Sequence, residues 1–181
     1  TDGNCELLLS SEKGMACRFL ESELRPIGRQ GRGVTGIRFK LNEDRVVSLE
    51  VFPREAESAS DAEAEAAGGA QLLVVTDGGM GKRSYLSGYR RTHRGARGVR
   101  NIKLKEGELV VGTIQVHPGD ELLMTTVKGQ MVRIRADEIR TVGRHSQGVR
   151  IIKLNARDRL TGISRIVEVD EENGTAPVAE D

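Results

Sequence analysis

The chain contains three copies of one sequence unit, which begin near Glu6, Gln71 and Glu121. The second and third copies are offset by 50 residues, and the first and second by 65. A unit of this size cannot bury its own hydrophobic face and is stabilised by stacking on its neighbours. The repeat therefore predicts an array of like units. The positions that keep one residue type in every copy include Gly14, Gly79 and Gly129; Arg18, Arg83 and Arg133; Arg29, Arg94 and Arg144; Gly33, Gly98 and Gly148.

Each unit has the pattern of a β-hairpin followed by two more strands. Apolar runs at residues 7–9, 72–75 and 122–124 precede a turn with glycine and then a second, alternating run. A third strand such as "GVTGIRF" (33–39) or "GVRIIKL" (148–154) and a fourth such as "RVVSLEV" (45–51) are expected after it. These patterns predict an all-β fold of propeller-like blades, each with four antiparallel strands and about 50 residues. Three blades leave open edges, so we expect further blades before Thr1 or an open arc.

The repeat divides the chain into five parts. Residues 4–53, 69–118 and 119–167 are the predicted blades. Residues 54–68 are the 15 extra residues between the first two copies, acidic and rich in alanine, and we expect a disordered insertion there. Residues 168–181 form an acidic tail with six acids and no base.

The net charge of +1 hides a strongly basic body. Outside the two acidic segments, 27 Lys and Arg residues stand against 16 Asp and Glu residues, and residues 82–103 hold eight bases and no acid. Arginines at equal repeat positions predict a periodic basic track, which suits the phosphates of duplex DNA. Two Tyr, three Phe and no Trp are too few to stack the bases of a single strand. The candidate DNA-binding residues are Arg18, Arg29, Arg32, Lys82, Arg83, Arg90, Arg91, Arg94, Arg97, Arg100, Lys103, Arg133, Arg135, Arg144, Arg150 and Lys153.

Two glycine-rich stretches resemble nucleotide-binding loops, but neither matches the motif at the positions that such a loop requires. "GRQGRGVTGIRF" (28–39) does not have the Rossmann order of glycines, and "TDGGMGKRS" (76–84) has Thr76 and Arg83 where a P-loop needs glycine and a hydroxyl residue. The cysteines and histidines share no metal-ligand or triad spacing. We therefore assign no catalytic residue, cofactor or metal site to this chain. A propeller-type protein interaction scaffold is the alternative to DNA binding.

Three stretches resemble the C-terminal domain of the A subunit of bacterial DNA gyrase, which is a type IIA topoisomerase. They are "RPIGRQGRGVTGI", "YRRTHRGARGVRNIKL" and "VRIRADEIRTVGRHSQGVRIIKL", and the acidic tail resembles the tail of that domain. The family's Q-R-R-G-G-K-G box is not in this chain, and "THRGARG" (92–98) is a partial echo of it. The A subunit of topoisomerase IV is a second possible relative.

The resemblance implies a β-pinwheel of six blades that exchange strands, of which this chain holds the last three and the tail. It further implies wrapping of duplex DNA in support of ATP-dependent negative supercoiling, with ATP and magnesium needed only by the holoenzyme. The implied partners are the rest of the gyrase A subunit, together with the gyrase B subunit, in a heterotetramer. The implied location is the bacterial cytoplasm, without a membrane. The catalytic tyrosine belongs to another domain, so Tyr85 and Tyr89 are expected to be structural or rim residues.

Overall fold

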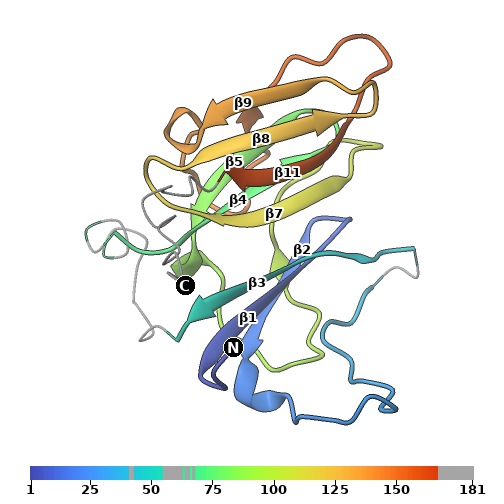
Figure 1. Cartoon of the computed structure of the whole chain (residues 1–181), viewed down its shortest axis with the longest axis vertical. Coiled ribbons are helices and arrows are strands. Elements are labelled where there is room, and N and C mark those ends of the chain that lie inside the picture. The colour runs from blue at the N-terminus through green and yellow to red at the C-terminus, as the bar shows by residue number, and fades with distance from the viewer. Residues whose placement is uncertain (41–42, 55–62, 64–65, 67, 167–181) are drawn as a thin grey trace, which may run out of the picture.

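The computed structural model describes residues 1–40, 43–54, 63, 66 and 68–166. Most of the predicted insertion and all of the predicted tail lie outside these residues. Three 3-10 turns, η1 (Glu21–Glu23), η2 (Leu86–Gly88) and η3 (Ala136–Glu138), accompany eleven strands among the described residues. The strands are β1 (Cys5–Ser11), β2 (Met15–Leu20), β3 (Val46–Pro53), β4 (Gln71–Thr76), β5 (Met80–Tyr85), β6 (Val99–Arg100), β7 (Val110–Val116), β8 (Glu121–Thr126), β9 (Met131–Arg135), β10 (Val149–Arg150) and β11 (Leu160–Ile166) (Figure 1).

Three antiparallel hairpins confirm the first part of each predicted unit. They are β1–β2, β4–β5 and β8–β9, and each pairs on its other side with a longer strand, β3, β7 or β11. The turns of the three hairpins hold Gly14, Gly79 and Gly129, all at φ +79°. This left-handed conformation is strained for residues with a Cβ, which explains why glycine recurs there.

The fourth strand of a sheet comes from the next repeat. The sheet orders are β3-β1-β2-β6, β10-β5-β4-β7 and β11-β8-β9, so β6 completes the first sheet and β10 the second. The Cα partners are Met15 with Arg100 and Met80 with Arg150. Strand exchange between neighbouring blades, implied by the resemblance, is thus present. The third sheet has three strands among the described residues.

The predicted third strand of each unit is wrong in length. Residues 33–39 form no strand, and in the other copies only Val99–Arg100 and Val149–Arg150 pair as strands. The chain then leaves the sheet to cross the preceding hairpin turn: Asn101 N donates to Gly14 O at 2.7 Å. In the next copy Ile151 N donates to Gly79 O at 2.9 Å. The apolar residues of "GVRIIKL" therefore cap a turn instead of extending a ladder.

The hydrophobic core lies between successive sheets. Leu8 and Phe52 of the first sheet pack with Leu72, Leu86 and Tyr89. Leu73 and Val75 of the second sheet pack in the same way with residues of the third, including Leu122, Met124 and Ile139. The Tyr89 side chain is fully buried and its hydroxyl donates to Asn101 Oδ1 at 2.7 Å, which confirms a structural role.

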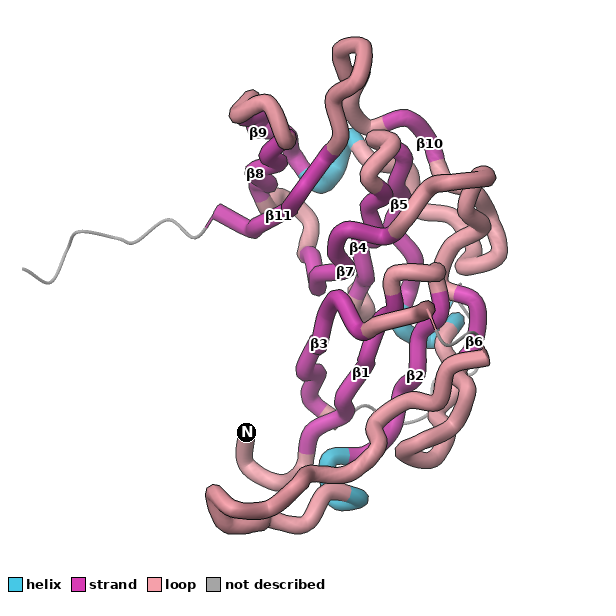
Figure 2. The backbone as a smooth tube through the Cα atoms, turned by 90° about the vertical axis from the view of Figure 1, so that its right-hand side faces the viewer, coloured by secondary structure: helices cyan, strands magenta, loops and turns pink. Residues whose placement is uncertain are grey.

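The strands have a common order from the inside of the arc to its outside. β3, β7 and β11 lie along one side of the molecule, and β6 and β10 along the other (Figure 2). Two side chains of β3 link it to β7, the inner strand of the next sheet. Ser48 Oγ accepts a hydrogen bond from Thr113 N at 2.8 Å, and Glu50 Oε2 accepts one from Gln115 N at 2.9 Å. The exchanged strands β6 and β10 are therefore the outer edges of their sheets, and the basic residues that they carry lie on that side.

Candidate nucleic-acid interface

The recurring arginine of the second hairpin strand fastens one repeat to the next. Arg18 is buried, forms an ion pair with Glu6, and donates from Nη1 to Leu86 O at 2.9 Å and Tyr89 O at 3.2 Å. Leu86 lies in the 3-10 turn η2 of the following repeat, and Tyr89 follows that turn directly. The burial of Arg18 corrects the expectation that it is an exposed phosphate contact.

Arg83 repeats this arrangement one blade further on. Its Nε donates to Ile139 O at 2.7 Å, and its Nη1 donates to Gln71 Oε1 at 3.1 Å. The side chain is only 12% exposed. Arg133 is the third copy; it pairs with Glu121 but is 57% exposed, and no turn of a following repeat contacts it among the described residues. We call Arg18, Arg83 and Arg133 the latch arginines.

The second recurring arginine also holds a neighbouring repeat. Arg94 is half-buried and donates from Nη1 to Thr35 O at 2.7 Å, while Arg144 donates from Nη1 to Arg100 O at 3.4 Å. Arg29, the first copy, is exposed. The recurrence of these two arginine positions is therefore explained by the repeated junction between blades, and does not by itself indicate a ligand.

Lys82 and Arg91 are also withdrawn from solvent. The Lys82 ammonium is fully buried and donates to Ser84 Oγ at 2.9 Å and Gly143 O at 3.1 Å. Burial, with a smaller contribution from the charge of Arg144, lowers the pKa of Lys82 to about 7. Arg91 is half-buried in an ion pair with Glu6. The expectation of an exposed cation is wrong at Lys82, because its side chain enters the junction between the second and third repeats.

Four of the exposed cations lie on or beside the exchanged strands. Arg100 and Lys103 occupy this place in the second repeat, and Arg150 and Lys153 occupy it in the third. No carboxylate of the described residues lies within ion-pair distance of these four side chains. We call these four residues the edge cations. The other predicted residues that are exposed are Arg29, Arg32, Arg90, Arg97, Arg133 and Arg135, the last of which pairs with Glu138 at 3.5 Å.

Three further basic residues extend this set and were missed by the sequence reasoning. Arg38 stands in the first repeat where Lys103 and Lys153 stand in the others, and Lys40 corresponds to Lys105. All three, Arg38, Lys40 and Lys105, are exposed. The signal that could have found them is the alignment itself, because the first position is basic in all three copies and the second is lysine in two of them.

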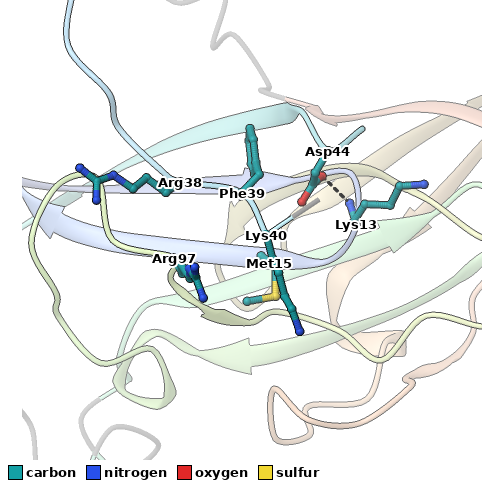
Figure 3. Close-up of a pocket in the computed structure, with 7 residues that line it drawn as sticks. All are labelled: Lys13, Met15, Arg38, Phe39, Lys40, Asp44 and Arg97. Atoms are coloured by element: carbon teal, nitrogen blue, oxygen red, sulfur yellow. Dashed lines mark hydrogen bonds between the residues drawn. The ribbon is translucent and has the colours of Figure 1, made fainter. Parts of the chain in front are cut away.

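A hollow of about 300 Å³ adjoins the outer edge of the first sheet. Figure 3 shows its lining, with Met15 and Phe39 among the side chains of Arg38, Lys40 and Arg97. Asp44 Oδ1 accepts a hydrogen bond from Lys13 N at 2.9 Å at one end. The arrangement combines apolar walls with several cations, and so adds positive potential to this side of the molecule.

A different group near the N-terminus offers possible metal ligands. One ligand atom each of Asp2, Cys5 and Glu21 lies within 4.8 Å of the others. Desolvation of the Cys5 thiol, with the nearby carboxylates, raises its pKa, and a metal requires the thiolate. We assign no metal to this group.

The described residues include no helix that is long and apolar enough to cross a membrane. This finding concerns helices alone.

A family model matches most of the chain. Its description is "DNA gyrase C-terminal domain, beta-propeller", and it matches residues 6–53, 70–117 and 120–166. Among curated proteins, the DNA gyrase A subunit of Chlamydia muridarum is 37% identical over 171 residues, which cover 93% of this chain and 19% of that protein. The DNA gyrase A subunit of Escherichia coli K12 is 39% identical over 175 residues, which cover 96% of this chain and 18% of that protein. The chain thus spans about a fifth of the length of these relatives.

Solved structures support the same fold. The crystal structure of the C-terminal domain of DNA topoisomerase IV has a TM-score of 0.77 at 26% identity, covering 92% of this chain and 48% of that chain. The E. coli ParC C-terminal domain has a TM-score of 0.64 at 18% identity, covering 92% and 64% of the two chains. The second likeness concerns the fold alone.

Proposed function

The chain belongs to the family of DNA gyrase C-terminal β-propeller domains, and from this premise we propose that it binds duplex DNA along its outer edge. The observation that carries the proposal is the row of exposed cations on the exchanged strands, which recurs with the repeat and has no ion-pair partner among the described residues. Lys and Arg side chains that neutralise phosphates release counterions and bind without reading sequence. A curved row of them favours DNA that follows the arc, and bending is the expected consequence.

The edge cations occupy equal places on two neighbouring blades. Arg100 and Arg150 are the last residues of β6 and β10, and Lys103 and Lys153 follow three residues later. Each side chain is exposed. A duplex that runs from one exchanged strand to the other would therefore meet the same pair of charges twice. Arg97 and Lys105 flank the first pair and extend the same charged edge.

We propose that the parent protein is a gyrase A subunit, which acts with the gyrase B subunit in the bacterial cytoplasm. In that assembly the bound and wrapped DNA would support ATP-dependent negative supercoiling. The identities of 37% and 39% to gyrase A subunits favour gyrase over topoisomerase IV. We assign this chain no cofactor, so its binding of DNA should persist in the presence of a metal chelator and without nucleotide.

Removal of two edge cations tests the proposal. The double variant Lys103→Gln/Lys153→Gln is expected to bind a mixed-sequence duplex roughly 10- to 60-fold more weakly at 0.1 M salt, because two phosphate contacts are lost. The dissociation constant is read from the fluorescence anisotropy of a labelled duplex.

The matched control removes two charges from the inner side. Arg54 follows β3 and Arg165 lies in β11, and both side chains are exposed. Arg54→Gln/Arg165→Gln is expected to change the affinity by less than about threefold, since these residues are far from the outer edge and only screened attraction is lost. Equal losses in the two double variants would argue against a binding edge. The absence of any duplex binding would favour the interaction scaffold.

A further inference from the structure

A lysine lies inside the junction between the second and third repeats, at a position where the other copies of the unit have neutral side chains. Lys82 of β5 is fully buried, and Cys17 and Val132 hold its position in the first and third repeats. The Lys82 side chain contacts the part of the third repeat that docks on β5. We call residues 140–152 the docked segment.

Few backbone hydrogen bonds fasten the docked segment to β5. At one end Arg83 N donates to Arg140 O at 3.2 Å, and Val142 N donates to Arg83 O at 2.9 Å. At the other end Ile151 N donates to Gly79 O at 2.9 Å. Between these ends only the two residues of β10 pair with β5. Detachment of the docked segment therefore breaks few bonds and leaves the β4–β5 hairpin intact, as in other local openings.

The hydrogen bonds of Lys82 fit an uncharged amine. Its Nζ donates to Ser84 Oγ at 2.9 Å and to Gly143 O at 3.1 Å, and Ser84 Oγ donates to Val142 O at 2.7 Å. Lys82 has no further hydrogen bond or ion pair among the described residues. Two donated bonds match the two N–H groups of a neutral amine, whereas an ammonium group has three to satisfy. The closed junction thus favours the neutral form of Lys82.

The charges around Lys82 act in the same direction. No carboxylate of the described residues pairs with it. Burial, and after it the positive charge of Arg144 on the docked segment, lowers the pKa of Lys82 to about 7. Val74 of β4 lies opposite on the neighbouring strand. The other charged or titratable side chains of the surrounding elements are exposed or bonded elsewhere: Arg83, Lys103, Arg140, His145 and Arg150.

We propose that Lys82 makes the docked segment a pH-sensitive switch, which closes on β5 while Lys82 is neutral and detaches more readily when Lys82 is protonated. An open segment exposes Lys82 to water, where a lysine has its ordinary pKa of about 10.4. Between that pH and about 7 the open form binds one proton more than the closed form. The ratio of open to closed segments therefore rises about tenfold for each unit by which the pH falls. Below pH 7 both forms are protonated, and the ratio levels off.

The switch acts on the charged outer edge of the molecule. Arg144 and Arg150 belong to the docked segment, and Lys153 follows it directly. Opening therefore releases Arg150 and Lys153, two of the edge cations, from their fixed places. This consequence alone rests on the proposed binding of DNA, because the switch itself is tested without DNA.

Hydrogen exchange of single amides tests the switch, followed by NMR on the 181-residue chain between pH 7 and 9. The amides of Val142 and Ile151 are hydrogen-bonded to β5 and its turn only while the segment is closed. Their exchange rate is the ratio of open to closed segments multiplied by the rate of a free amide, which rises about tenfold per pH unit. Because the ratio falls by the same factor, both rates in the wild type are expected to stay constant within about threefold.

Lys82→Met removes the titrating group from the junction. Its Val142 and Ile151 amides are expected to exchange roughly 30- to 800-fold more slowly than those of the wild type at pH 7, and their rates should rise about tenfold per pH unit. Lys128→Met is the matched control, because Lys128 is an exposed lysine in the turn between β8 and β9. It should keep the wild-type profile.

Urea separates local opening from unfolding of the whole chain. Local opening exposes little surface, so the rates at Val142 and Ile151 should not change with urea below the unfolding transition, whereas amides in the middle of β4 should exchange faster. Three results would overturn the proposal. They are wild-type rates at Val142 and Ile151 that rise tenfold per pH unit, rates that are the same in Lys82→Met, and rates that increase with urea as steeply as those of β4.

Discussion

Replacement of Arg18 by methionine is expected to lower the free energy of unfolding by about 3–5 kcal/mol, because a buried carboxylate loses one of its two cationic partners and two carbonyls lose their donor. The Glu6 carboxylate is fully buried between Arg18 and Arg91. Two carbonyls of the next repeat, Leu86 O and Tyr89 O, also lose their donor. Urea unfolding followed by circular dichroism gives the free energy.

Arg133→Met is the matched control for this effect. Arg133 has the same repeat position and the same pairing with an acid, but its side chain is exposed and holds no following turn among the described residues. The expected loss is less than about 1 kcal/mol, as for other surface ion pairs. Both substitutions are made in the same 181-residue chain. Equal losses at Arg18 and Arg133 would show that the contacts of Arg18 with the following blade do not account for its effect on the free energy of unfolding.

Replacement of Lys82 by methionine is expected to stabilise the protein near pH 7. The pKa of Lys82 is about 7 in the folded chain, against about 10.4 for an unperturbed lysine. Between these values the unfolded chain binds the extra proton, so the stability of the wild type rises with pH by up to about 5 kcal/mol. The methionine variant lacks this dependence. It also leaves Gly143 O without its donor, at a cost of about 1–3 kcal/mol.

The pH profile separates this charge effect from packing. Lys82→Met should exceed the wild type in unfolding free energy by about 2–4 kcal/mol at pH 7. The advantage should shrink by about 1.4 kcal/mol for each pH unit above 7 and should reverse before the pH reaches about 10.4. Cys17 and Val132 occupy the same position in the other repeats, so an uncharged side chain fits the site. Urea unfolding of both proteins at several pH values measures the difference, and a difference independent of pH would contradict the depressed pKa.

The sequence patterns predicted the hairpins well because each is a local structure. An apolar run, a glycine turn and a second run specify β1–β2, β4–β5 and β8–β9 within about 16 residues. The partner of β2 could not be derived from the first unit alone, since β6 lies some 80 residues further along the chain. β6 has only two residues, which is too short for the alternation of apolar and polar residues that predicts a strand. The exchange was expected only from the resemblance to a known family.

The recurrence of Arg18 and Arg83 does not identify a binding site, although the repeat suggested it. A residue recurs in a repeat protein when every unit binds the same ligand, and it also recurs when every unit makes the same junction. Arg18 and Arg83 recur for the second reason, and the acceptor side chains Glu6 and Gln71, twelve positions earlier in each unit, were a signal of it. Arg100 and Lys103 agree better with a shared ligand than with a shared junction. Their counterparts Arg150 and Lys153 are likewise basic and exposed, and have no ion pair in the described part of the chain.

The salt dependence of duplex DNA binding tests most directly whether the edge cations contact phosphates. The logarithm of the association constant for a mixed-sequence duplex is expected to fall with the logarithm of salt concentration with a slope of about −3 or steeper, close to 0.9 for each phosphate contact. In Lys103→Gln/Lys153→Gln the slope should become shallower by about 2, while Arg54→Gln/Arg165→Gln should keep the wild-type slope. A wild-type affinity that does not change with salt, or equal slopes in all three proteins, would contradict DNA binding along this edge.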